Sequence, residues 1–159
     1  MVRSICILLG ALLVLPVGIA QQVAQQKGST VMHHAHGTFT VKTAPLTPAP
    51  AEGLARYSID KEIHGDLEAT TKGEMYAGGD YSKGAAGYVA IEMVTGTLGG
   101  KHGSFALQHF ATMDASGLKM NVQVVPGSGT GELVGIAGTF TITIAGGVHS
   151  YDLEYALPS

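Results

Sequence analysis

The sequence predicts an all-β protein that forms a single eight-stranded antiparallel up-and-down barrel. Glycine is abundant, with 23 residues in a chain of 159, whereas only 6% of the residues are aromatic. Apolar and polar residues alternate in several runs, as in half-buried strands, and no window shows a convincing helical period. Short connections between consecutive runs indicate a meander, and closure of eight strands into a barrel removes the exposed sheet edges.

Turns and loops separate the β-patterned runs. A proline-dense connection, APLTPAPAEG (44–53), follows the first run and is unsuited to a helix or an inner strand. Gly65-Asp66 predicts a tight turn, AGGDYSKG (77–84) a loop and Gly99–His102 a further turn. We expect the strands to be His36–Thr43, Ala55–His64, Leu67–Tyr76, Ala86–Leu98, Gly103–Thr112, Leu118–Val125, Leu133–Ile144 (bent near Gly135 and Gly138) and His149–Leu157.

The N-terminal segment has the features of a secretory signal peptide. Arg3 supplies a positive charge before the apolar run Ile5–Ala20, and Gly18 and Ala20 are the small residues that signal peptidase requires. A membrane anchor is the alternative, but the run is shorter than the ~20 residues of a spanning helix and contains Pro16. We expect cleavage after residue 20.

Export follows from this interpretation. We expect residues 1–20 to be removed, 21–31 to form a flexible tail and 32–159 to form the barrel domain of a periplasmic or extracellular protein. No stable membrane insertion is expected after cleavage. Cys6 is the only cysteine and lies in the cleaved segment, so disulfides and thiol chemistry are not expected. The formal net charge of −3, without a basic cluster among aromatics, argues against a nucleic-acid partner.

Five stretches carry a family resemblance over nearly the whole mature chain. They are HAHGTFTVK (34–42), IDKEIHGDLEATTKGEM (59–75), GYVAIEMVTGTLGGKHGSFALQH (87–109), VVPGSGTGELVGIAG (124–138) and YDLEYALP (151–158). The chain resembles the bacterial family called domain of unknown function 3224, whose members form a barrel similar to allene oxide cyclase. The family has no assigned activity. The resemblance implies, by analogy of fold, a barrel that handles small apolar molecules in its lumen or at its mouth.

One position departs from the family pattern. After Gln108-His109 the family usually has a small polar residue and a glycine, whereas this chain has Phe110-Ala111. If Phe110 faces the lumen, it narrows or reshapes the cavity. We therefore count Phe110 among the candidate ligand-binding residues.

The strongest polar candidates lie in the central hairpin. If its turn is centred near Gly100, Glu92 and Gln108 are cross-strand neighbours on the face that also carries Tyr88, whereas His109 points away. A lumenal Glu92 would have a raised pKa and would serve as a catalytic acid or base, with Tyr88 and Gln108 binding the ligand. The alternative is that Glu92 is exposed on the outer wall or has a structural partner.

Two other polar clusters are interpreted as ordinary surface. Asp60, Glu62 and His64 share one strand face, as do Asp152 and Glu154, and a solvated outer face explains both patterns better than a metal site does. A further cluster, His33, His34 and His36, has no carboxylate or cysteine beside it in the sequence, so we interpret it as at most a weak, adventitious site. We expect no metal and no cofactor. The glycine-rich segment 127–131 lacks the spacing of a phosphate loop and is interpreted as a corner.

Three functions remain open. The first is a binding module that holds a small apolar molecule in the barrel. The second is an enzyme of the cyclase or isomerase type, in which Glu92 is the acid–base group and the shaped cavity folds the substrate. The third is a structural or interaction barrel without a lumenal ligand, which associates through its outer wall as a homo-oligomer.

Overall fold

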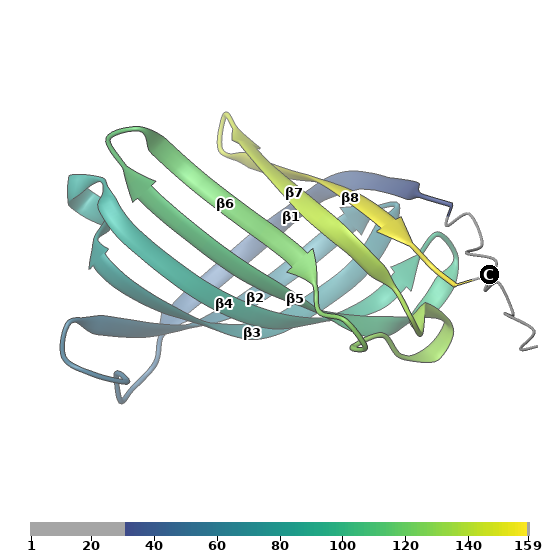
Figure 1. Cartoon of the computed structure of the whole chain (residues 1–159), viewed down its shortest axis with the longest axis horizontal. Helices are drawn as coiled ribbons and strands as arrows, with labels where there is room; N and C mark the ends of the chain where they lie inside the picture. Colours follow the sequence, from purple (N-terminus) through teal and green to yellow (C-terminus); the bar gives the residue numbers. More distant parts are fainter. Residues whose placement is uncertain (1–30, 159) are drawn as a thin grey trace, which may run out of the picture.

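The computed structural model describes residues 31–158 and shows a closed antiparallel barrel of eight strands (Figure 1). The predicted fold class is confirmed. The predicted signal peptide (1–20) and all but the last residue of the predicted tail (21–31) lie outside the described residues. The strands are β1 (His33–Pro45), β2 (Leu54–Gly65), β3 (Leu67–Asp80), β4 (Ala85–Leu98), β5 (Lys101–Asp114), β6 (Gly117–Val124), β7 (Ala137–Ala145) and β8 (Val148–Ala156).

Each strand pairs with the next one along the chain, and β1 pairs with β8 to close the barrel. The closing seam extends from the pair His33↔Tyr155 to the pair Phe39↔His149. Two single 3-10 turns, η1 (Tyr81–Lys83) and η2 (Gly131–Leu133), lie in the connections. Among the described residues, no helix has the length and apolar character that crossing a membrane requires.

The predicted seventh strand begins too early. Residues 131–133 form η2, and β7 starts only at Ala137. The connection before it bonds to β5, because Thr130 N donates to Ser104 O at 2.8 Å and Val125 N donates to Ala106 O at 2.9 Å. This connection buries Leu133 and Ile136 against the end of the barrel.

The two ends of the barrel differ. The end with the β2–β3, β4–β5 and β6–β7 connections, which is on the right in Figure 1, is filled by apolar side chains. Leu67, Leu98, Phe105, Leu107, Leu133 and Leu153 are each at most 1% exposed. Further along the barrel, Phe140 stacks on Tyr151 with ring centroids 5.0 Å apart. The opposite end carries η1 and the β5–β6 turn and has fewer fully buried side chains.

The β4–β5 turn sets the register of the central hairpin. Gly99 and Gly100 have φ values of 55° and 81° and form a two-residue turn closed by the pair Leu98↔Lys101. Both central residues of such a turn need positive φ, which suits glycine. The turn centre therefore lies between the two glycines, and Glu92 pairs with Leu107 instead of Gln108. A shift of one residue in register exchanges the inner and outer faces of β5, so the expected faces of that strand were wrong.

The two phenylalanines of β5 provide a test of this register. Phe105 is fully buried and Phe110 is 57% exposed on the opposite face. We expect Phe105→Ala to lower the free energy of unfolding by about 3–5 kcal/mol, because it leaves a cavity in the core. The same change at Phe110 should alter it by no more than about 0.5 kcal/mol. Urea unfolding followed by circular dichroism measures both, and an equal loss would contradict the register.

Candidate functional site

Four polar side chains meet inside the barrel, about halfway along it. Lys61, Thr71, Glu92 and His109 come from the neighbouring strands β2, β3, β4 and β5 and are 6%, 2%, 1% and 6% exposed. Lys61 pairs directly with Thr71 across β2 and β3. His109 is two residues from the cross-strand partner of Glu92, so the two side chains are diagonal neighbours on the inner face. We call these four residues the buried polar cluster.

Both oxygens of the Glu92 carboxylate are engaged. Lys61 Nζ donates to Oε1 at 2.5 Å, and Thr71 Oγ1 donates to Oε2 at 2.6 Å. His109 Nε2 lies 2.8 Å from Oε1, but the contact is out of line, so this buried nitrogen has no regular hydrogen bond. The Lys61 ammonium also lies 5.0 Å from the centre of the Phe39 ring, a favourable cation–π distance. The charge of Glu92 is therefore compensated by side chains of three neighbouring strands.

A glycine on β3 makes room for Glu92. Gly73 is the direct cross-strand partner of Glu92. A Cβ atom at Gly73 would lie 2.5 Å from Glu92 Cβ and 2.3 Å from Ile91 O, both too close for real contacts. Glycine at this position allows the two backbones to approach each other closely beside the buried carboxylate.

The expectation of a raised pKa for Glu92 was wrong. Burial alone would raise this pKa, but the contact with His109 and the positive charge of Lys61 outweigh it and lower the pKa to about 2. Glu92 is therefore ionised at neutral pH and is a weak proton acceptor. The sequence contained a sign of this pairing, because Lys61 occupies an inner position between the buried Ile59 and Ile63.

A pocket of about 700 Å³ opens at the end of the barrel that carries η1. Inward-facing side chains of several strands form its wall, mainly apolar ones, and Glu92 is not part of the lining. Tyr88 lies on the inner face of β4, between the pocket and Glu92. Burial and the negative charge of Glu92 raise the pKa of Tyr88, so its phenol stays protonated. The lining residues used below are Tyr57, Met75, Ala77, Tyr88, Met113 and Leu118.

The structure separates the residues that the sequence grouped together. Tyr88 and Glu92 do share the inner face of β4. Gln108 and Phe110 lie on the outer wall, where they border a shallow groove, so the expected lumenal position of both residues was wrong. His109, expected to point away from Glu92, contacts it instead. The shift in register explains all three differences.

The outer wall around Phe110 is apolar. Val89, Ile91, Met93 and Phe110 are 56%, 55%, 44% and 57% exposed and occupy outward positions on β4 and β5. Val89 pairs directly with Phe110, and Ile91 pairs with the uncharged Gln108. We call Val89, Ile91, Met93 and Phe110 the outer strip. Contiguous exposed apolar surface of this kind often marks a site of association.

The predicted surface clusters have different outcomes. Asp60 pairs with Lys72 across the outer face of β2 and β3, and His64 pairs with Glu68 at 3.0 Å, in keeping with a solvated wall. His34 and His36, in contrast, have a carboxylate beside them, because closure of the barrel brings Asp152 to within 3.0 Å of His34. No local sequence pattern indicated this neighbour, since Asp152 is 118 residues away from His34.

Removal of the Lys61 ammonium should show how much the buried polar cluster contributes to the stability of the barrel. We expect Lys61→Met to lower the free energy of unfolding by about 3–5 kcal/mol, because it leaves the Glu92 carboxylate buried without its cation. Lys72→Met is the matched control, since Lys72 also pairs with a carboxylate across neighbouring strands but is 84% exposed, and it should have little effect. The double variant Lys61→Met/Glu92→Gln should recover part of the loss in chemical denaturation. Equal losses for Lys61→Met and Lys72→Met would contradict this account.

Comparisons with known proteins identify the family. A comparison with curated proteins found no match. Among solved structures, the chain is similar to a protein of unknown function from the DUF3224 family of Shewanella oneidensis MR-1. The two are 42% identical with a TM-score of 0.73, and the match covers 81% of this chain and 100% of the other.

A comparison with family models gives the same family. None of these comparisons bears on the likeness to allene oxide cyclase, which stays a prediction. The family described as "Protein of unknown function (DUF3224)" matches residues 35–155. The chain therefore belongs to the DUF3224 family.

Proposed function

We propose that this protein binds a small, mainly apolar molecule at the mouth of its barrel. The observation that carries the proposal is the pocket of about 700 Å³ at the η1 end, which falls within the size range of small-molecule sites. Met75, Met113 and Leu118 provide apolar surface in its wall. Methionine side chains adapt to irregular shapes, so the wall suits a hydrocarbon-like ligand.

The pocket also offers a polar anchor. The raised pKa of Tyr88 keeps its hydroxyl protonated, so it can donate a hydrogen bond to a carbonyl, ether or hydroxyl oxygen of the ligand. Tyr57 lines the same pocket and offers a second hydroxyl. The described residues that line the pocket include no lysine or arginine to pair with an anionic ligand. We therefore propose a neutral apolar ligand with at least one oxygen.

The cyclase or isomerase alternative is less well supported. It requires an acid–base group in contact with the substrate. Glu92 has a pKa of about 2, its two oxygens already have partners, and it is not part of the pocket wall. In the proposed binding protein, Glu92 acts as a positioning residue that holds Lys61 and Thr71 beneath the pocket floor.

A blocked pocket tests the proposal. Ala77 faces the pocket from β3, and its neighbour Tyr76 faces outward and is 39% exposed. We expect the neutral fluorescent probe N-phenyl-1-naphthylamine to bind the wild-type protein saturably. Ala77→Trp should weaken binding by about tenfold or more, because an indole occupies the volume that the probe needs. Tyr76→Trp introduces the same side chain on the outer face and should leave the affinity unchanged.

Two outcomes of the probe titration would overturn the proposal. One is the absence of saturable binding to the wild type, and the other is an equal loss of affinity in both tryptophan variants. Native mass spectrometry of protein purified from its own host complements the titration by revealing a copurified molecule. We also propose that the protein is exported, and the same spectrum tests this, because cleavage after residue 20 gives a mature chain that starts at Gln21.

The expected homo-oligomer remains a prediction, and the outer strip gives it a test. The strip carries no charged side chain, so the same surface on a second copy can pack against it without charge repulsion. Light scattering over a range of protein concentrations should show a dimer that Ile91→Lys reverts to a monomer. Val148→Lys, at a residue that is 56% exposed on β8, is the control and should leave the dimer intact. A wild-type mass that stays monomeric at every concentration would contradict the prediction.

A further inference from the structure

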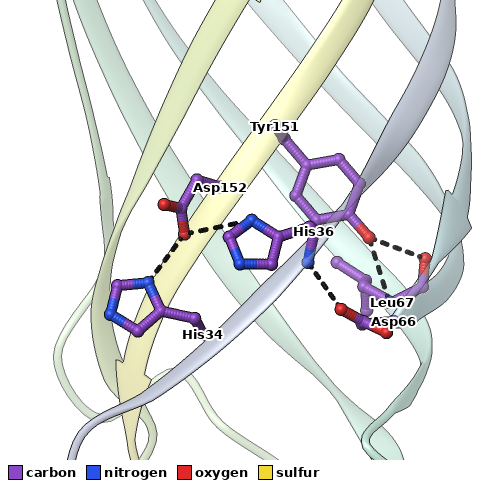
Figure 2. A network of polar contacts seen from close by, with 6 residues as sticks. All are labelled: His34, His36, Asp66, Leu67, Tyr151 and Asp152. Carbon is purple, nitrogen blue, oxygen red and sulfur yellow. Dashed lines mark hydrogen bonds and ion pairs between the residues drawn. The ribbon is translucent and has the colours of Figure 1, made fainter.

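Two histidines and an aspartate gather on the outer face of the seam that closes the barrel (Figure 2). His34 and His36 are two residues apart on β1, so their side chains project from the same face of the strand. Asp152 on β8 is the direct cross-strand partner of His36. Figure 2 shows the Asp152 carboxylate between the two imidazole rings, with contacts to both.

The distances among these three side chains suit a common metal ion. Asp152 Oδ1 lies 3.0 Å from His34 Nδ1 and 3.8 Å from His36 Nδ1, and one potential ligand atom from each residue lies within 4.8 Å of the others. Ligand atoms about 2.0–2.1 Å from a tetrahedral zinc ion are about 3.3 Å apart. The observed contacts bracket that separation. Small rotations of exposed side chains would therefore bring the three atoms around one ion.

The backbone that carries the cluster is well anchored. His36 N donates a hydrogen bond to Asp66 Oδ2 at 2.8 Å, which joins β1 to the β2–β3 turn (Figure 2). On the neighbouring strand, the hydroxyl of Tyr151 accepts a hydrogen bond from Leu67 N at 3.0 Å. The pairing of β1 with β8 continues on both sides of the cluster. The ligand atoms therefore project from a rigid frame, which reduces the entropy lost when an ion binds.

The charge around the cluster also favours a cation. Glu154 is the cross-strand partner of His34 and lies on the same outer face as Asp152. Two carboxylates therefore stand opposite the two imidazoles. Imidazole nitrogen with carboxylate oxygen is a common ligand set for zinc and other first-row divalent metals. Magnesium and calcium prefer ligand sets made only of oxygen.

We propose that His34, His36 and Asp152 form a binding site for a divalent transition-metal ion, such as Zn²⁺. Three protein ligands leave one tetrahedral position for a water molecule. The bound ion links β1 to β8 and so reinforces the seam on which closure of the barrel depends. This site lies on the outer wall and is independent of the pocket at the barrel mouth.

The experiment is a calorimetric titration of chelator-treated protein with ZnCl₂ at pH 7.5. We expect one saturable site per chain in the wild type. His36→Gln and Asp152→Asn should each weaken it by about tenfold or more, since each removes one of three ligands. His64→Gln is the matched control, because His64 forms a similarly exposed histidine–carboxylate pair of 3.0 Å with Glu68, without a second histidine. The control should bind Zn²⁺ like the wild type.

A second measurement separates ligation from damage to the fold. Zn²⁺ should raise the midpoint of thermal unfolding of the wild type and of His64→Gln, but not that of His36→Gln, because only an ion bound to the folded state stabilises it. Equal unfolding midpoints of the metal-free variants would show that the substitutions leave the barrel intact. The proposal fails if the wild type shows no saturable site, or if His64→Gln loses as much affinity as His36→Gln.

Discussion

The carboxylate of Glu92 is buried in the middle of the barrel, and its charge constrains the residues around it. An ionised carboxylate away from water is stable only with a cation and hydrogen-bond donors beside it. Lys61 and Thr71 supply these from two neighbouring strands, and His109 contacts the same group from a third. The positions of β2, β3, β4 and β5 are thereby tied to one another through a single side chain.

The buried polar cluster divides the lumen into a packed region and a region that contains the pocket. On one side, apolar side chains and the connection before β7 fill the barrel. On the other side, the wall carries Tyr57, Met75 and Tyr88 and encloses the pocket. A small eight-stranded barrel can either be packed throughout or hold one small ligand. This barrel is packed with side chains at one end and has a pocket of ligand size at the other. The charged layer between them separates the packed end from the pocket.

The outer wall carries two features that are separate from the lumen. The outer strip on β4 and β5 is uncharged and exposed, whereas the seam between β1 and β8 presents histidines opposite carboxylates. They differ because outward side chains are free of the packing demands that determine the inner face. The proposed association surface and the proposed cation site therefore lie on different strands of one barrel.

Much of the fold followed from the sequence by itself. Alternation of apolar and polar residues, glycine-rich turns and short connections predicted eight antiparallel strands that close into a barrel, and the family resemblance rested on the same stretches. These are local signals, because strand periodicity and turn chemistry depend on residues that are close in the chain. Tyr88 and Glu92 were placed on one inner face for the same reason.

The partners of those residues were decided only by the tertiary structure. The position of the turn centre at Gly99 and Gly100 determines which face of β5 is inward. A centre at Gly100 shifts the pairing by one residue, so the sequence predicted Gln108 beside Glu92, where the structure has His109. His34 and Asp152 meet because β8 returns to pair with β1, although 118 residues separate them in the chain. Sequence periodicity assigns a side chain to a face, but pairing across strands depends on register and closure, which are properties of the whole barrel.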